Sequence, residues 1–189
     1  MIVAITVVAA ACSGSSSTRR RVRATTTSSS TSTSAPSSTS TTSPAIPTCR
    51  VGQLAAELAS GSPGAGQRYA SITFTNNGAA PCSMLGYLGL QLLDEGGVHV
   101  ATTVVRTTGA PKALVVLAPG GQAFTTLHWG VVPGDGEPAD GACEPTASQV
   151  EITPPNETHS LVQPWTLGLV CQQGAIDTPP VQAGAAPPG

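Results

Sequence analysis

Short runs in which apolar and polar residues alternate, each closed by glycine, proline or asparagine, constrain this chain more than any other feature. In the clearest run, Ala70, Ile72 and Phe74 alternate with Ser and Thr until Asn77-Gly78 ends the pattern. In a β-strand, successive side chains point to opposite faces, so alternation of apolar and polar residues indicates a strand with one buried face. Glycine supplies the positive φ that tight reversals need. Because 21 Gly and 17 Pro stand among 189 residues and only 10% are charged, the composition excludes a coiled coil or helical bundle.

Similar runs recur towards the end of the chain. They are Leu88 to Leu92, Val98 to Val100, Leu114 to Leu117, Ala123 to Trp129, Val150 to Ile152, Trp165 to Cys171, and Ala175-Ile176 with Val181. The first two flank a glycine-rich turn and predict a hairpin. Residues 53–60 (QLAAELAS) alone have helix formers at helical spacing, and they form either a short helix or a first strand. About seven to nine short strands with such turns predict an all-β antiparallel sandwich with Greek-key connections.

The first twelve residues have the pattern of an export signal. Met1 to Ala11 is too short to span a bilayer but long enough for the apolar region of a secretory signal. Small residues before Cys12 resemble a bacterial lipobox, in which the cysteine is lipidated and becomes the mature N-terminus. Two features depart from that pattern, since Ala9 stands where leucine is usual and no Lys or Arg precedes the apolar run. We expect lipidation at Cys12, and a misassigned start at Met1 with the basic region upstream.

Residues 13–48 have too few apolar groups to fold. Ser and Thr make up 23 of these 36 residues, and the large apolar side chains are Val22 and Ile46. Such a segment cannot bury enough surface to offset its ordering entropy, so we expect a disordered tether with a reach of about 30–35 Å. The composition also suits a glycosylated stalk. We therefore expect a leader (1–12), a tether (13–48), one β-sandwich domain (49–181) and a flexible tail (182–189).

The charge of the domain excludes one class of partner. Its ten acidic residues outnumber its four basic residues, and the whole chain has a net charge of −2. This balance predicts no binding to nucleic acid, whose phosphates require clustered Lys and Arg. The arginines at 19–21 and 23 lie within reach of lipid head groups if Cys12 is lipidated, although a solvated charge run is the alternative.

Four cysteines remain after Cys12, and an even number behind an export signal predicts disulfides. Four cysteines allow three pairings. We favour the pairing of chain neighbours, Cys49–Cys82 and Cys143–Cys171. A zinc site is the competing interpretation, but the chain has no Cys-x-x-Cys and no Cys/His pair at ligand spacing.

Several segments together carry a family resemblance. They are Asn76-Asn77-Gly78 with Pro81-Cys82, then Gly86-Tyr87 and Leu88 to Leu92, then Leu117 to Gly121, and Ile152 to Pro155 with Cys143 and Cys171. In order and spacing they resemble an exported-lipoprotein domain of actinobacteria, known only as domain-of-unknown-function family 4232. The resemblance covers Cys49 to about Val181. It implies an immunoglobulin-like β-sandwich at the cell surface of a high-GC Gram-positive organism, with no catalytic residue and no ligand assigned.

No sequence pattern of known catalytic chemistry appears. Gly-x-Ser-x-Gly, Ser-x-x-Lys, His-Glu-x-x-His and the phosphate-binding loops are absent from the chain. His99, His128 and His159 fall in three different elements, and we expect them to be exposed surface histidines. We predict no catalytic residue, no cofactor and no metal site.

Two further features have a structural and a functional interpretation. The acidic loop 134–141 suggests calcium, but Asp140 stands where an EF-hand requires glycine. We expect a solvated hairpin loop there, with a weak cation site as the alternative. Trp129 and Trp165 lie on the apolar faces of their runs, which favours the sandwich core over a sugar-stacking platform.

Two classes of function remain. The first is a non-enzymatic binding or structural module of the cell envelope, a monomer held at the outer face of the membrane by a lipid anchor. Its partner would be an envelope protein, a glycan or a lipid. The second is an extracytoplasmic enzyme whose site is assembled from scattered residues such as His128, Glu151 and Asp94. We expect the first; a cleft of convergent titratable groups would favour the enzyme, and an exposed apolar patch would favour binding.

Overall fold

A computed structural model describes residues 45–140 and 142–187, so the expected leader, Cys12 and nearly all of the expected tether lie outside the described residues. A short 3-10 turn (Val51–Gln53) precedes the first strand. The strands are β1 (Leu54–Ser60), β2 (Gln67–Asn76), β3 (Cys82–Leu85), β4 (Gly89–Leu93), β5 (Thr103–Arg106), β6 (Leu114–Leu117), β7 (Gln122–Gly130), β8 (Gln149–Thr153), β9 (Leu161–Pro164), β10 (Ala175–Thr178) and β11 (Gln182–Ala183). Among the described residues no helix is long and apolar enough to cross a membrane.

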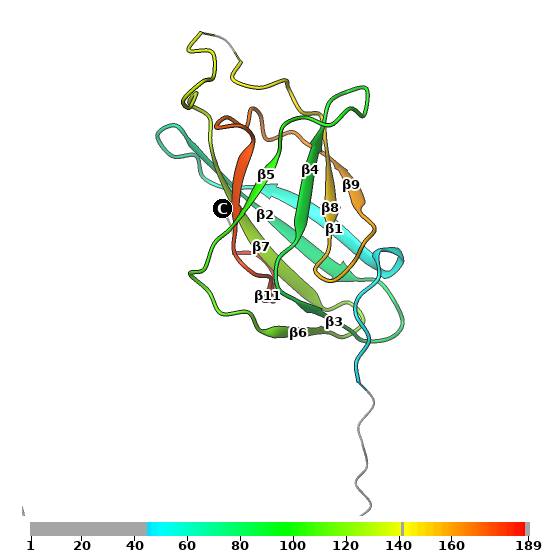
Figure 1. Ribbon diagram of the computed structural model, residues 1–189. Helices are drawn as coiled ribbons and strands as arrows, with labels where there is room; N and C mark the ends of the chain where they lie inside the picture. Colours follow the sequence, from blue (N-terminus) through cyan, green and yellow to red (C-terminus); the bar gives the residue numbers. More distant parts are fainter. Residues whose placement is uncertain (1–44, 141, 188–189) are drawn as a thin grey trace, which may run out of the picture. The chain divides into compact units, whose positions relative to one another are not determined.

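The strands form two sheets and a two-stranded ribbon (Figure 1). The main sheet has the order β1-β2-β7-β10-β5, with β11 beside β7, and the second sheet has the order β4-β8-β9. The strands β3 and β6 pair with each other as the ribbon. Every pair is antiparallel except β10 with β5. The predicted all-β sandwich is confirmed, and it contains one parallel pair that the sequence did not predict.

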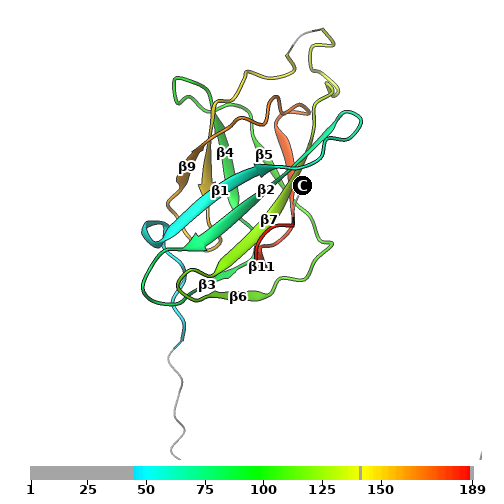
Figure 2. The ribbon, with the colours of Figure 1, turned by 180° about the vertical axis from the view of Figure 1, so that it is seen from behind.

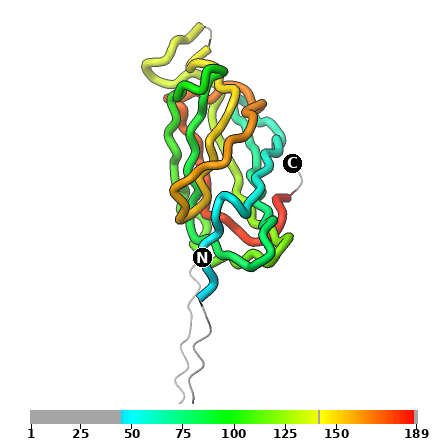
Figure 3. The backbone as a smooth tube through the Cα atoms, turned by 90° about the vertical axis from the view of Figure 1, so that its right-hand side faces the viewer, coloured from blue at the N-terminus to red at the C-terminus, as the bar shows by residue number. Residues whose placement is uncertain are grey.

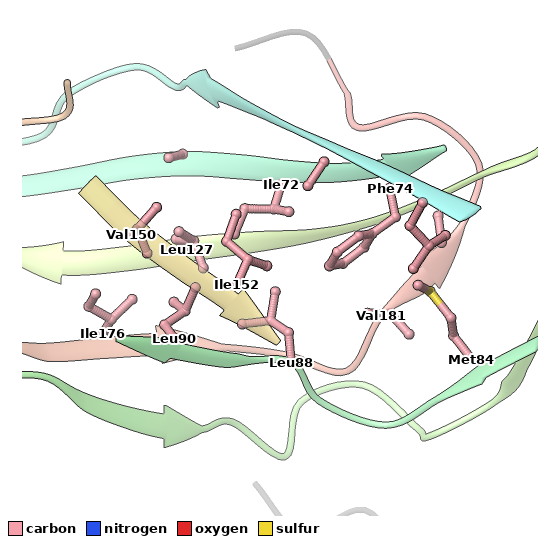
Figure 4. Close-up of a cluster of buried hydrophobic side chains, with 14 of the residues drawn as sticks. Ile72, Phe74, Met84, Leu88, Leu90, Leu127, Val150, Ile152, Ile176 and Val181 are labelled. Atoms are coloured by element: carbon pink, nitrogen blue, oxygen red, sulfur yellow. The ribbon is translucent and has the colours of Figure 1, made fainter. Parts of the chain in front are cut away.

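The core lies between the two sheets, as the close-up in Figure 4 shows. Inward positions of β2, β7 and β10 bring Ile72, Leu127 and Ile176, and the second sheet contributes Val150 and Ile152. All five side chains are fully buried. The burial alternates along β2 and β8 as a period of two requires, so the sequence pattern that predicted the strands also predicted which face is covered.

A buried asparagine joins the main sheet to the ribbon. The Nδ2 of Asn76 donates to the carbonyl oxygens of Ala80 at 2.9 Å and Leu117 at 3.0 Å, and its Oδ1 accepts the Gly78 N–H at 2.9 Å. Because each polar atom of this buried amide has a partner, it carries no uncompensated desolvation cost. The Asn-Asn-Gly turn therefore also fixes where the ribbon begins.

Both predicted disulfides are present. Cys49–Cys82 links the chain just before β1 to the first residue of β3, with the Cα atoms 4.7 Å apart. Cys143–Cys171 links the segment after β7 to the segment before β10, with the Cα atoms 5.4 Å apart. The pairing of chain neighbours is confirmed, and it points to an oxidising, extracytoplasmic compartment.

Two ambiguous or partial predictions are settled by strand pairing. Residues 54–60 of the QLAAELAS segment form strand β1 and not a helix, because their backbone pairs along the whole strand with β2. The predicted hairpin of Leu88 to Leu92 with Val98 to Val100 is reduced to one isolated bridge, Leu93 with His99. The partner of β4 is instead β8, which follows far later in the chain.

The predicted strand from Trp165 to Cys171 is wrong, because this segment is irregular. Gly168 has a φ of +86°, which breaks an extended strand. The two indole N–H groups replace ladder hydrogen bonds: Trp129 donates to the Leu169 carbonyl at 2.9 Å, and Trp165 donates to the Gly168 carbonyl at 2.8 Å. Both tryptophans are buried with ring centroids 5.3 Å apart, so the predicted core role is confirmed.

The C-terminal boundary also differs from the prediction. Residues 182–189 were expected to be a flexible tail, but Gln182 pairs with Phe124 and Ala183 with Ala123, which makes β11 part of the main sheet. Figure 3 shows this last segment lying along the domain. A two-residue strand leaves no alternation to detect, which is why the sequence pattern missed it.

Candidate functional site

A groove of about 720 Å³ lies on the outer face of β1, β2 and β7. Figure 2 shows this face of the sheet. Cross-strand pairing places outward side chains of three strands side by side, with Ala59 beside Ser71 and Ser71 beside Thr126. Residues 185–187, which follow β11, form one wall. The groove has the volume of a small-molecule or oligosaccharide site but is open to solvent.

The polar side chains that line the groove carry hydroxyl and amide groups and a single charge, and alanine, glycine and proline form the rest of its lining. Its polar lining residues are Ser60, Ser62, Tyr69, Ser71, Thr73, Gln122, Thr126 and Glu57. Hydroxyls and amides both donate and accept hydrogen bonds, whereas the carboxylate of Glu57 accepts only. Because no Lys or Arg among the described residues lines the groove, its chemistry suits a neutral ligand rich in hydroxyl groups more than an anionic one.

A row of three side chains crosses the sheet at one end of this groove. Tyr69, His128 and Asp177 are neighbours across β2, β7 and β10. The Tyr69 ring stacks on the His128 ring with centroids 4.8 Å apart and planes inclined by 28°. His128 Nδ1 lies 3.0 Å from Asp177 Oδ2, which orients the imidazole. The half-exposed Tyr69 ring is thereby held in place as part of the groove lining.

The residues considered for an enzyme do not come together. His128 lies on β7 in the main sheet, Glu151 lies on β8 in the second sheet, and Asp94 follows β4. His128 is paired with Asp177, and the hydrogen bonds of its side chain among the described residues include no serine or cysteine. His99 and His159 are exposed, as expected.

The acidic loop is held by backbone N–H groups, one from the loop itself and one from the segment before β10. Glu137 accepts hydrogen bonds from the Gly134 N–H at 2.6 Å and the Gln173 N–H at 2.5 Å. These bonds, that of Gln173 first, hold the pKa of the Glu137 carboxyl below its usual value because they stabilise the charged form. Its carboxylate lies near Cys143 and Cys171, but their sulfur atoms form a disulfide and so offer no thiolate to a metal ion.

A second glutamate links two loops at the other end of the domain. Glu157 accepts a hydrogen bond from the Thr158 N–H at 2.9 Å and lies 3.5 Å from the Arg50 guanidinium. The Thr158 hydrogen bond first, and then that of Val51 and the charge of Arg50, hold the pKa of Glu157 below its usual value. The Glu157 side chain is only 3% exposed, and its negative charge is offset by the neighbouring Arg50.

No sequence pattern marks the groove. Its residues sit at polar positions of strands, where Ser and Thr are ordinary solvent-facing residues. The row of Tyr69, His128 and Asp177 depends on strand pairing between residues 49 to 59 positions apart, which alternation cannot reveal. The alternation did predict that His128 faces away from the core.

The comparisons with known proteins give one match. Residues 49–186 match the family described as Domain of unknown function (DUF4232). No curated protein and no solved structure matches the chain significantly. The matched segment begins at the first disulfide cysteine and ends beyond β11, so it spans both sheets and the ribbon. The chain therefore belongs to the DUF4232 family.

Proposed function

We propose that this protein is an exported lipoprotein, anchored through Cys12 at the outer face of the cell membrane, that binds a neutral glycan without catalysing a reaction. The observation that carries the proposal is the hydroxyl-lined groove on β1, β2 and β7 with Tyr69 held at one end. None of the described residues that line the groove is a Lys or an Arg, which fits a ligand without phosphate or carboxylate groups. An actinobacterial source is part of the same proposal.

The side chains that line the groove favour a carbohydrate ligand over a peptide. Sugars present vicinal hydroxyls that both donate and accept, and the serine and threonine hydroxyls along the floor can meet both needs. The Tyr69 ring offers an apolar face for the C–H groups of a sugar ring, and its stacking on His128 limits the entropy lost on binding. Glu57 adds one acceptor at the exposed edge strand β1.

The proposed localisation rests on two separate observations. The apolar leader with small residues before Cys12 has the pattern of a lipidated export signal. Two disulfides within the domain support passage to an oxidising compartment. A non-enzymatic role is supported by the scatter of His128, Glu151 and Asp94 over different strands.

The proposed lipid anchor predicts a modified N-terminus. Mass spectrometry of the native protein should find diacylglycerol on Cys12 as the first residue of the mature chain. Cys12→Ala should release or mislocalise the protein, whereas Ser13→Ala, which leaves the cysteine in place, should not. Recovery of an unmodified Met1 end from the cytoplasm would refute the anchor.

The groove predicts retention by neutral polysaccharides. The full chain should be retarded in native gels that contain a neutral mannan or β-glucan, and not in gels that contain anionic polygalacturonate. Tyr69→Ala should weaken the retardation about tenfold, because the stacking surface for the sugar is lost.

Tyr87→Ala is the matched control, since Tyr87 does not line the groove and its hydroxyl instead donates to the Thr107 carbonyl at 2.9 Å. The glycan assignment fails if neither neutral polymer retards the protein, or if the two alanine variants lose retention equally.

A further inference from the structure

The outer face of the β3–β6 ribbon carries apolar side chains that the described residues leave exposed. Leu85 and Leu114 are cross-strand partners, and Val116 lies two residues beyond Leu114 on the same face. Ile46 lies beside them, because the Ser83 hydroxyl donates to the carbonyls of Ile46 at 3.3 Å and Pro47 at 3.2 Å. These four side chains, which we name the ribbon patch, are 41–61% exposed. The opposite face of the ribbon is buried through Met84, Val115 and Leu117.

Strand register places the ribbon at one end of the sandwich. β2 begins beside the last residue of β7, since Gln67 pairs with Gly130, and it ends at Asn76, which bonds to the last residue of β6. The loops after β4 and β7 therefore lie at the end opposite the ribbon, as Figure 1 shows. We name the two ends the ribbon end, with loops 107–113 and 154–160, and the loop end, with residues 94–97, 131–140 and 142–147.

The charges of the domain divide between these two ends. At the ribbon end, Arg106 and Lys112 lie over the Tyr87 ring at 5.4 and 5.2 Å from its centroid, and Arg50 is well exposed. These are three of the four basic residues of the domain. The ribbon end also holds Glu157, whose charge offsets that of Arg50, so the positive charge of this end rests on Arg106 and Lys112.

The loop end is acidic. Its six carboxylates are Asp94, Glu95, Asp135, Glu137, Asp140 and Glu144, and its basic residue is Arg68 at the start of β2. The domain thus has a net negative charge but presents a positive end, and the apolar patch lies at that positive end. A surface that is both apolar and cationic complements anionic lipid head groups above an acyl layer.

The described chain also begins at the ribbon end. Residue 48 forms a bridge with Ser83 of β3, and the Ser83 N–H donates to the Pro47 carbonyl at 2.8 Å. The described chain therefore begins beside the ribbon patch, where the 44 preceding residues are joined to it. A chain fixed to a membrane at Cys12 brings this end towards the lipid before any other.

We propose that the ribbon end docks on an anionic lipid surface, with the ribbon patch at the head groups and the loop end pointing away. Ile46, Leu85, Leu114 and Val116 enter the interface, and Arg50, Arg106 and Lys112 contact lipid phosphates. This orientation deepens the proposed localisation in the envelope, and the apolar patch and the basic residues argue for it even without a lipid on Cys12. Each basic residue near such a surface raises binding roughly fivefold.

The test uses the full chain with Cys12→Ser, so that no acyl chain contributes and no free thiol remains at position 12. An environment-sensitive fluorophore is attached at Leu114→Cys in one protein and at Val162→Cys in another. Val162 is a matched control, since it is exposed to a similar degree on β9, outside the patch. Vesicles of phosphatidylcholine with phosphatidylglycerol should shift the emission at position 114 to the blue and leave position 162 unchanged.

Charge and self-association are then separated. Arg106→Gln with Lys112→Gln should lower vesicle affinity roughly twentyfold, and added salt should also lower it, because both weaken the electrostatic attraction.

Docking is overturned if the chain does not bind these vesicles, or if it binds while position 114 keeps its emission. A blue shift at position 114 that grows with protein concentration without vesicles would assign the patch to a second copy of the chain. A shift at position 114 together with an unmodified native Cys12 would keep the docking and remove the anchor.

Discussion

Gly174→Ala should destabilise the domain by about 3 kcal/mol or more, one of the two largest effects we expect. Gly174 has a φ of +70° and is the third of three consecutive residues with positive φ, after Gln172 and Gln173. A Cβ at this position would overlap the carbonyl oxygen of Ala101 and crowd the Cα of Thr102, and both are backbone atoms. The backbone of β5 cannot move away easily, because Thr103 donates to the Gly174 carbonyl at 2.8 Å. Chemical denaturation with circular dichroism measures the loss.

Gly97→Ala separates backbone strain from steric overlap. Gly97 has a φ of +76°, but no heavy atom lies within 4 Å of the position of its Cβ. This variant should lose only about 1–2 kcal/mol, the cost of a left-handed conformation for a residue with a Cβ. Equal losses for the two variants would show that contact with the 101–102 backbone contributes nothing.

Loss of either disulfide should cost about 3.5–4 kcal/mol in the chain-entropy account, given sequence separations of 33 and 28 residues. That is a large share of the 5–15 kcal/mol typical of a folded domain, so a chain lacking both bridges should be largely unfolded at body temperature. Cys143→Ser should lower the free energy of unfolding clearly, and Cys171→Ser added to it should change little more, because its partner is already unpaired. Denaturant titration of the single and double variants measures this.

The two bridges should behave as independent units. Cys49→Ser and Cys82→Ser should be redundant with each other, and their effect should add to that of the Cys143–Cys171 pair, since the bridges lie in different parts of the fold. Non-reducing peptide mapping provides the direct check. A linked peptide joining Cys49 to Cys143, or Cys82 to Cys171, would contradict the pairing, and four free thiols would contradict the compartment.

The alternation of apolar and polar residues predicted both the position and the buried face of strands that have a neighbouring strand on each side. β2, β7 and β8 are such strands, and Ile72, Leu127 and Ile152 point inward as expected. β5 was missed because it is an edge strand with little burial, so its Thr-Val-Val-Arg sequence shows no alternation. The run from Trp165 to Cys171 alternates without forming a strand, because a loop can also bury Trp165 against Trp129.

The candidate site was beyond prediction for a different reason. The groove and the Tyr69–His128–Asp177 row depend on which strands are neighbours, and period-two patterns do not encode neighbours. The disulfides were predictable because cysteines have few possible partners, and the pairing of chain neighbours was the favoured one of the three that the sequence left open. Ser71, Thr73 and Thr126 have many equivalents along the chain, so only the fold identifies them.

The Cys49–Cys82 bridge also determines how the domain carries mechanical load. A pull on the N-terminal chain reaches Cys49 soon after residue 45 and passes through the sulfur atoms directly to Cys82 at the start of β3. The 33-residue segment between them, about 110 Å of extended chain, is therefore excluded from the path of the force. That segment contains β1 and β2, and with them Glu57, Tyr69, Ser71 and Thr73 of the groove. Tension on the N-terminal chain would thus act on the pairing of β3 with β6 before it reached β1 and β2, and reduction of this one bridge would reverse that order by allowing β1 to be peeled from the edge of the sheet.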